Sequence, residues 1–150
     1  MKKITLIMLV CILGGYIARA QSENTIPAKV FNSLTAAYGE EVEPWQWNSN
    51  GKVYIAFFQH EDEFKFCRID LEGTIQEKGN ETFSEVLPEA VLDAYRAATG
   101  EDEPSEVYEL QGKKHQGQFL LSKENDIEKV MYLYDSTGKE IRKEKFTPSM

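Results

Sequence analysis

The sequence predicts an α+β fold, made by tandem duplication of one helix followed by a four-stranded antiparallel sheet. The first observation is a repeat, because residues 26–41 return 61 positions later as residues 87–102 with the proline, the valine, the Ala-Ala pair and the glycine in place. The second is an apolar stripe at helical period in each copy, and the third is a series of turn signals after each stripe. We expect the copies to form one cooperative body, since about sixty residues is near the lower limit for an independent core.

An N-terminal secretory signal peptide is predicted at residues 1–20. Lys2 and Lys3 form a positive start, and the apolar run at residues 4–13 is too short to span a bilayer. The segment Ala18-Arg19-Ala20 places small residues at the −3 and −1 positions of a cleavage site. We therefore expect an exported protein, periplasmic or extracellular, with no membrane insertion after the signal is removed.

Processing would leave a first helix-plus-sheet repeat at residues 21–84 and a second at residues 85–150, joined at residues 79–86 and ending in a loose tail at residues 147–150. Cleavage removes three basic residues and no acidic one, so the net charge changes from −8 to −11. This balance disfavours nucleic acids and anionic membranes as partners, because phosphate contacts are made by clusters of Lys and Arg.

The cysteines and histidines give little sign of chemistry. A lipid anchor on Cys11 is the alternative to signal cleavage, but Val10 stands where a lipoprotein signal carries a small residue. Cys67 has no partner for an intramolecular disulfide after cleavage, and its strand-like surroundings favour a small buried apolar residue. His60 and His115 lack the spacing of a zinc site.

Catalytic motifs are absent from the sequence, which has no Gly-x-Ser-x-Gly elbow, no phosphate loop and no dinucleotide-binding fingerprint. We expect no cofactor, no metal and no catalytic residue, and therefore a protein that is not an enzyme.

Apolar residues at every fourth position predict one helix at residues 26–38 and another at residues 87–98. Each has a proline in its first turn, where a missing N–H is tolerated, and a glycine just after its last turn. These residues are Pro27 and Gly39 in the first helix and Pro88 and Gly100 in the second. Helices of about three turns are marginal alone in water, so each is expected to pack on a sheet.

Turn signals divide the rest of each copy into short antiparallel strands. Asn50-Gly51 and Gln111-Gly112 mark hairpins, and Asp70-x-x-Gly73 and Asp135-x-x-Gly138 mark four-residue turns. The Asp-x-x-Gly turns are 65 positions apart rather than 61, which places four extra residues in the second copy, within residues 122–126. The expected strands are residues 45–47, 53–58, 64–70 and 74–77, then residues 107–110, 119–121, 129–135 and 139–142.

This order of motifs resembles the PepSY-like, or β-lactamase-inhibitor-like, family of exported bacterial proteins over residues 25–146. The motif residues are Pro27, Val30, Trp47, Tyr54, Phe58, Asp70 and Gly73, with their partners in the second copy. The resemblance implies a fold of two helix-plus-sheet repeats and a binding role. It does not imply a shared target, because the chain lacks the inhibitor's cystines and carries Glu106 where the first copy has Trp45.

An exposed sheet surface in the first copy is the candidate contact site. Aligned by 61 positions, Ile55 and Phe57 match glutamines and Trp45 matches a glutamate, so this face is polar in the second copy. If the same face meets solvent in the first copy, these three side chains form an apolar contact surface. The alternative is that they pack in the core or against the second copy.

The acidic loop after this strand is a second candidate contact. Glu61 and Asp62 would enter a cationic pocket of a partner, where desolvated charge pairs add specificity. The alternative is a solvated hairpin tip. The sequence thus predicts a non-enzymatic binding module for another envelope or extracellular protein, with inhibition of an enzyme or protease as one form of that role. Two other functions stay open, a carrier or sensor for a small ligand or peptide and a self-associating structural subunit.

Overall fold

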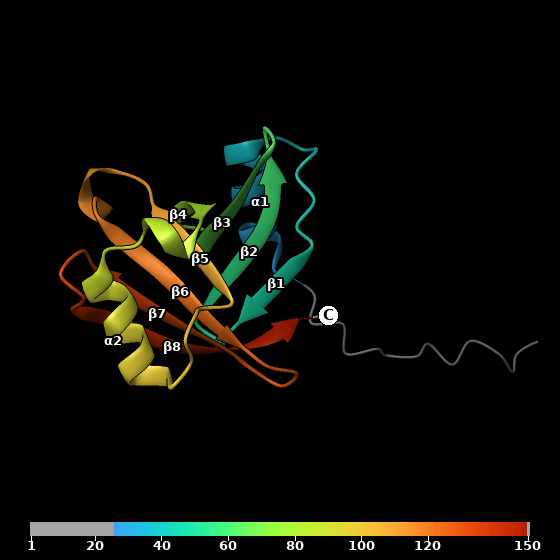
Figure 1. The fold of residues 1–150 in the computed structure, drawn as a ribbon. Coiled ribbons are helices and arrows are strands. Elements are labelled where there is room, and N and C mark those ends of the chain that lie inside the picture. The colour runs from blue at the N-terminus through green and yellow to red at the C-terminus, as the bar shows by residue number, and fades with distance from the viewer. Residues whose placement is uncertain (1–25, 150) are drawn as a thin grey trace, which may run out of the picture.

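The structure, a computed structural model, describes residues 26–149 and consists of a closed antiparallel barrel of eight strands with two short α-helices on its outside (Figure 1). The predicted signal peptide, its cleavage site and Cys11 lie outside the described residues. The first helix and the strands that follow it are α1 (Ala28–Tyr38), β1 (Gln46–Ser49), β2 (Val53–His60), β3 (Glu63–Asp70) and β4 (Ile75–Thr82). The second helix and its strands are α2 (Glu89–Thr99), β5 (Glu106–Leu110), β6 (Gln118–Glu124), β7 (Lys129–Asp135) and β8 (Glu140–Ser149). Two short 3₁₀ turns complete the described chain, η1 (Ser84–Val86) and η2 (Lys113–His115).

The predicted α+β fold of two duplicated helix-plus-sheet units is wrong, because the strands form one mostly β barrel. Each strand pairs with the next along the chain, β4 pairs with β5, and β8 returns to pair with β1. A four-stranded sheet on its own would leave two edge strands with unpaired N–H and C=O groups, and barrel closure removes those edges.

Both seams of the barrel use residues that were predicted to be irregular. Residues 79–82, taken as part of a joint, are the second half of β4, and Gly79 pairs with Leu110 of β5. Residues 147–149, taken as a loose tail, pair with β1, with Thr147 opposite Ser49. Gly79 has no room for a larger residue, since an added Cβ would lie 2.5 Å from the carbonyl oxygen of Glu109 and 2.6 Å from the ring of Phe66.

Three apolar clusters follow from the alternation of side chains along the strands. The inner core fills the barrel, and its residues are Val53, Ile55, Phe57, Phe66, Tyr108, Leu110, Leu120, Met131, Leu133 and Phe146. Each of the other two lies outside the barrel wall beneath one helix. Under α1 they are Val30, Leu34, Val42, Ala56, Phe58, Cys67 and Ile69, and under α2 they are Leu87, Val91, Tyr95, Val107, Phe119, Leu121, Val130, Tyr132 and Tyr134.

Both predicted helices are present, although each begins two residues later than predicted, at the residue after its proline. Pro27 and Pro88 precede the first helical residues, and Gly100 ends α2 in the left-handed region with φ of 72°. The β3–β4 turn packs against the start of α1, where the Ser33 hydroxyl donates to the carbonyl oxygen of Gly73 at 2.5 Å. Within residues 26–149, neither helix is long and apolar enough to cross a membrane.

Candidate functional site

Two of the predicted contact residues, Ile55 and Phe57, lie inside the barrel. Their exposed fractions are 1% and 0%, so the expectation that they face solvent is wrong. The face of β2 that carries them is covered by the opposite wall of the barrel, where the ring of Tyr108 lies 5.7 Å from that of Phe57. Barrel closure thus turns the surface that was expected to be open into the main core.

The error arose from the alignment of two hairpins. Val53 of β2 pairs with Asp70, and Gln118 of β6 pairs with Asp135, so the two strands begin at the same distance from their turns. The offset between these strands is therefore 65 positions, as it is between the turn aspartates. The insertion therefore precedes β6, in the segment that contains η2, and not within residues 122–126 as predicted. The counterpart of Phe57 is the buried Ser122 rather than a glutamine.

The other three predicted contact residues are exposed at one end of the barrel. Trp45 lies just before β1, where its N–H donates to the carbonyl oxygen of Phe57 at 3.0 Å, and its side chain is 52% exposed. Glu61 and Asp62 form the two-residue turn between β2 and β3, with φ of 53° and 62°. Positive φ at both central residues is typical of the type I′ turn that matches the twist of a hairpin.

Two exposed phenylalanines extend this region into an aromatic patch, which we call the rim cluster (Trp45, Phe64 and Phe83). Phe64 is 47% exposed and its ring lies 5.5 Å from that of Trp45 in an edge-to-face arrangement. Phe83 follows β4 and is 76% exposed. Sequence reasoning missed both residues. Phe64 is the first residue of an expected strand, whose pattern does not show that this side chain is exposed, and Phe83 stands alone in a segment without periodicity.

A hollow of about 220 Å³ lies between the start of β3 and the end of β4. The pairing of these strands stops at Lys65↔Asn80, so the first residues of β3 and the last of β4 are not paired with each other. The end of β4 instead pairs with β5. The lining residues are Asp62, Glu63, Phe64, Asn80, Glu81, Thr82 and Phe83, which include three carboxylates and two members of the rim cluster.

The carboxylates of the hollow differ in their surroundings. Glu63 lies 2.5 Å from the ammonium of Lys65 and accepts a hydrogen bond from Asn80 at 3.1 Å. The hydrogen bond and charge of Lys65 lower the pKa of Glu63. Burial, followed by the nearby carboxylate of Glu106, raises the pKa of Glu81. Unlike Glu63, Glu81 has no basic side chain paired with it among the described residues, and its charged neighbour is another carboxylate.

A buried ammonium lies in the barrel interior at the same end. Lys129, the first residue of β7, is 0% exposed, and its Nζ lies 2.5 Å from Glu106 Oε2 and 3.3 Å from Glu124 Oε2. The contact with Glu106 is a close ion pair. The same Nζ lies 4.1 Å from the centre of the Phe57 ring, a cation–π distance. Sequence reasoning missed this group, since a lysine at a strand start is usually solvated.

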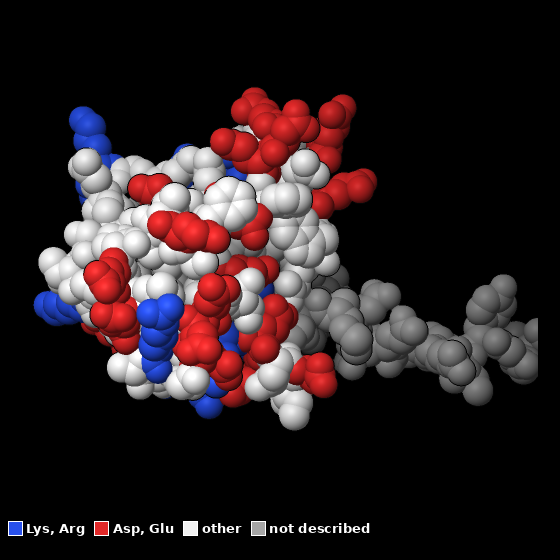
Figure 2. All heavy atoms as spheres, viewed as in Figure 1, with Lys and Arg blue, Asp and Glu red and all other residues white. Residues whose placement is uncertain are grey.

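Acidic side chains dominate this face of the molecule. Figure 2 shows them gathered at the top, above the β2–β3 hairpin, and again in the middle of the view over β5 and β6, with few Lys and Arg between them. A surface of one sign next to exposed aromatic rings favours a partner of the opposite sign.

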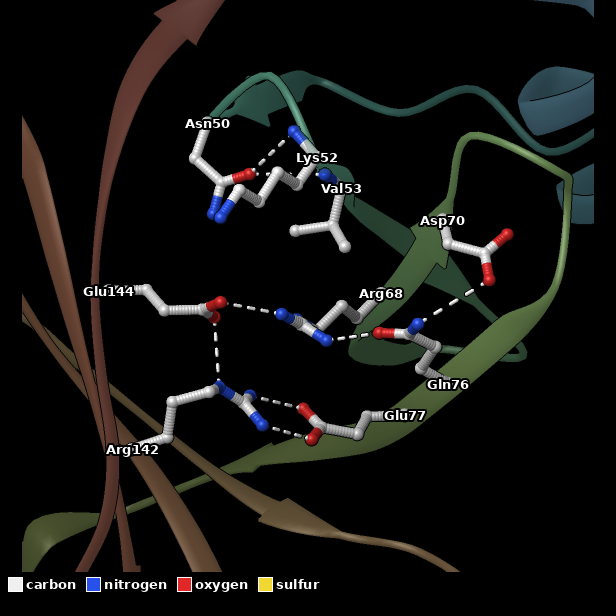
Figure 3. A network of polar contacts seen from close by, with 9 residues as sticks. All are labelled: Asn50, Lys52, Val53, Arg68, Asp70, Gln76, Glu77, Arg142 and Glu144. Carbon is white, nitrogen blue, oxygen red and sulfur yellow. Dashed lines mark hydrogen bonds and ion pairs between the residues drawn. The ribbon is translucent and has the colours of Figure 1, made fainter.

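The other end of the barrel carries a polar network that is paired within the protein (Figure 3). Arg142 of β8 donates two hydrogen bonds to the carboxylate of Glu77 at 2.5 and 2.6 Å, and a third to Glu144 at 2.9 Å. Arg68 of β3 donates to Glu144 at 2.6 Å and to Gln76. These bonds join β3 and β4 to β8 across the interior, so we assign the network to the fold rather than to binding.

The remaining chemical groups are few. Cys67 is buried beneath α1, as predicted, and burial raises the pKa of its thiol to about 12. Among residues 26–149, no three His, Cys, Asp or Glu side chains are grouped so as to hold a metal ion. Two larger hollows, of about 580 and 680 Å³, lie beside the β1–β2 turn and beside the C-terminal end of α1.

Comparison with known proteins gives no match to a protein family and none to a curated protein. Several solved structures are similar in fold. One is a DUF2874 family protein from Bacteroides uniformis, with 21% identity, a TM-score of 0.47, and coverage of 81% of this chain and 90% of that one. Another is a presumed periplasmic protein from Bacteroides eggerthii, with 18% identity, a TM-score of 0.47, and coverage of 81% and 89%.

A third similar structure is a BLIP-like protein from Bacteroides fragilis, with 20% identity, a TM-score of 0.42, and coverage of 81% of this chain and 87% of that one. The sequence motifs resemble a family described by two names, PepSY-like and β-lactamase-inhibitor-like, and the description of this structure agrees with the second name. None of the three descriptions mentions a PepSY domain.

Proposed function

We propose that this protein is an exported, non-enzymatic binding module whose rim cluster contacts another envelope or extracellular protein. The observation that carries the proposal is the exposure of three neighbouring aromatic side chains, 52% for Trp45, 47% for Phe64 and 76% for Phe83. Exposed apolar side chains gathered on one part of a folded domain mark contact sites, and large aromatic residues are the usual anchors of protein interfaces. The acidic turn beside the cluster favours a partner with positive potential.

A binding role also agrees with the state of the strongest nucleophile in the described chain. Cys67 is 0% exposed, and its raised pKa keeps the thiol protonated and unreactive at neutral pH. A small ligand held between a helix and the sheet is less well supported, because buried side chains of the outer clusters fill the space beneath each helix. The hollow of about 680 Å³ lies beyond the C-terminal end of α1 rather than beneath the helix. Self-association through the rim cluster would bring together two acidic surfaces of a chain with net charge −8.

The test is a crosslinking pull-down from native envelope with the mature chain, residues 21–150, as bait. Trp45→Ala and Phe83→Ala are expected to abolish capture of a specific protein and to leave the melting temperature nearly unchanged, since both side chains are at least half exposed. Matched controls are Phe31→Ala on α1, 41% exposed, and Ile127→Ala in the β6–β7 loop, 80% exposed.

Retention of capture by the two control variants and its loss from the two rim variants would support the proposal. Equal capture by all five proteins would refute it. Size measurements by light scattering over a range of concentrations would show whether the bait captures a second copy of itself instead.

A further inference from the structure

We propose that the hollow between Phe64 and Phe83 receives an arginine side chain of the partner protein. This inference rests on the proposed function and names the chemistry that the same surface would recognise. It follows from the size of the hollow, its charge, and a similar arrangement elsewhere in the barrel.

The size of the hollow fits one side chain rather than a whole ligand. Its volume is about 220 Å³, whereas pockets for small-molecule ligands are typically about 300–1,000 Å³. It is open to solvent at the barrel rim, between the exposed rings of Phe64 and Phe83. A long, flexible side chain carried on a protein surface could enter from outside without any opening of the fold.

The hollow is lined by negatively charged side chains, which favour a cationic group. Three carboxylates line it, and among residues 26–149 only Lys65 pairs with one of them, at Glu63. Within the part of the chain that the structure describes, no hydrogen bond or ion pair is made by the side chain of Asp62 or Glu81. Glu81 also lies close enough to Glu106 for the two negative charges to repel each other. A guanidinium in the hollow would offset the repulsion between Glu81 and Glu106, and it could donate hydrogen bonds to the carboxylates of Asp62 and Glu81.

The barrel already contains an example of this kind of recognition. The ammonium of Lys129 is enclosed by the ring of Phe57 at 4.1 Å and by the carboxylates of Glu106 and Glu124 at 2.5 and 3.3 Å. The hollow offers the same two elements, aromatic rings and carboxylates, and Lys65 neutralises only Glu63 among its described carboxylates. Arginine suits it better than lysine because a planar guanidinium can stack on a ring and donate to two carboxylates at once.

A titration with single amino-acid derivatives followed by NMR would test the proposal. The probes are N-acetyl-arginine amide and N-acetyl-citrulline amide, which have nearly the same shape and differ in charge. We expect the arginine probe to shift the amide signals of residues 62–64 and 81–83 with saturation in the millimolar range, and the citrulline probe to shift them at least tenfold less at equal concentration.

Glu81→Gln and Phe83→Ala should each weaken the response to the arginine probe, while Glu140→Gln, which removes an exposed charge at the start of β8, should not. Equal responses to arginine and citrulline, or a response that survives Glu81→Gln unchanged, would overturn the inference. The proposed function is judged separately. If capture depends on Phe83 but arginine does not bind, the partner uses other chemistry. If arginine binds but capture is independent of the rim cluster, the function is wrong.

Discussion

At the scale of single residues, Phe57 links the core of the barrel to its buried charge. Its ring packs against Tyr108 on one side and lies 4.1 Å from the ammonium of Lys129. The buried ion pair of Lys129 with Glu106 gains strength from the low dielectric of the interior but also carries a desolvation cost. Phe57 therefore contributes through both apolar burial and the shielding of this pair.

Replacing Phe57 by alanine is expected to lower the free energy of unfolding by about 3–5 kcal/mol, because it leaves a cavity in a fully buried site. Urea unfolding followed by tryptophan fluorescence would measure it. Phe31→Ala, at a position 41% exposed, is the control and should cost less than about 1 kcal/mol. A similar small loss for Phe57→Ala would contradict its place in the inner core.

The aspartates that open the β3–β4 and β7–β8 turns make stability depend on pH. Asp70 accepts hydrogen bonds from the backbone N–H groups of Thr74 and Glu72, and these lower the pKa of its carboxyl. Asp135 accepts bonds from the hydroxyl and N–H of Thr137 and from the N–H of Lys139, with the same effect on its pKa. A pKa below the unfolded value of about 3.9 means that folding favours the charged carboxylate.

The stability from these carboxylates is therefore present above about pH 4 and is lost as the pH falls through the lowered pKa of the folded state. Asp135→Asn should destabilise the protein at pH 7, and the difference from wild type should shrink at about pH 2.5. Denaturant unfolding at the two pH values would show it, with Asp126→Asn in the exposed β6–β7 loop as control. An equal difference at both values would rule out this origin.

At the scale of elements, local signals predicted the helices and turns well. The prolines and glycines around α1 and α2 act within a few residues of the helix ends, and the Asp-x-x-Gly turns close on their own backbone. The helix ends and the turns could be predicted because the residues that form them lie within a short stretch of sequence.

The seams of the barrel could not be predicted in the same way. The second half of β4, Gly79 to Thr82, is polar or small at every position, because its partner strand rather than its own pattern makes it a strand. Phe57 was misplaced because the repeat gave the wrong offset for β6. The rim residues Phe64 and Phe83 come together only where β3 and β4 separate, which no periodicity reveals.

Gly79→Ala tests the seam between β4 and β5. The added methyl would overlap the carbonyl oxygen of Glu109 and the ring of Phe66, so the strands must move apart at a cost of about 1–3 kcal/mol. Thermal unfolding would measure the loss. The double variant Gly79→Ala/Phe66→Leu should recover only part of it, because the carbonyl stays in the way. A neutral Gly79→Ala substitution would mean that the strands are further apart than described.

At the scale of the whole molecule, the β1–β8 seam joins the first and last strands of the barrel. Three residue pairs hold it, from Ser49↔Thr147 to Trp47↔Ser149. Removal of residues 147–150 should open this seam and lower the melting temperature by roughly 5–10 °C, since it deletes a few backbone hydrogen bonds. Deletion of Met150 alone is the control. An unchanged melting temperature in the longer truncation would show that the seam contributes nothing to stability.

Ring closure also limits how another molecule can be recognised. Many binding domains capture extended peptides by adding a strand to an open sheet. Within the described residues each strand pairs with a neighbour on both sides over at least part of its length, so the barrel has no strand with one edge wholly unpaired. Closure therefore leaves protruding side chains, rather than strand addition along a full edge, as the main means by which this barrel can recognise a partner.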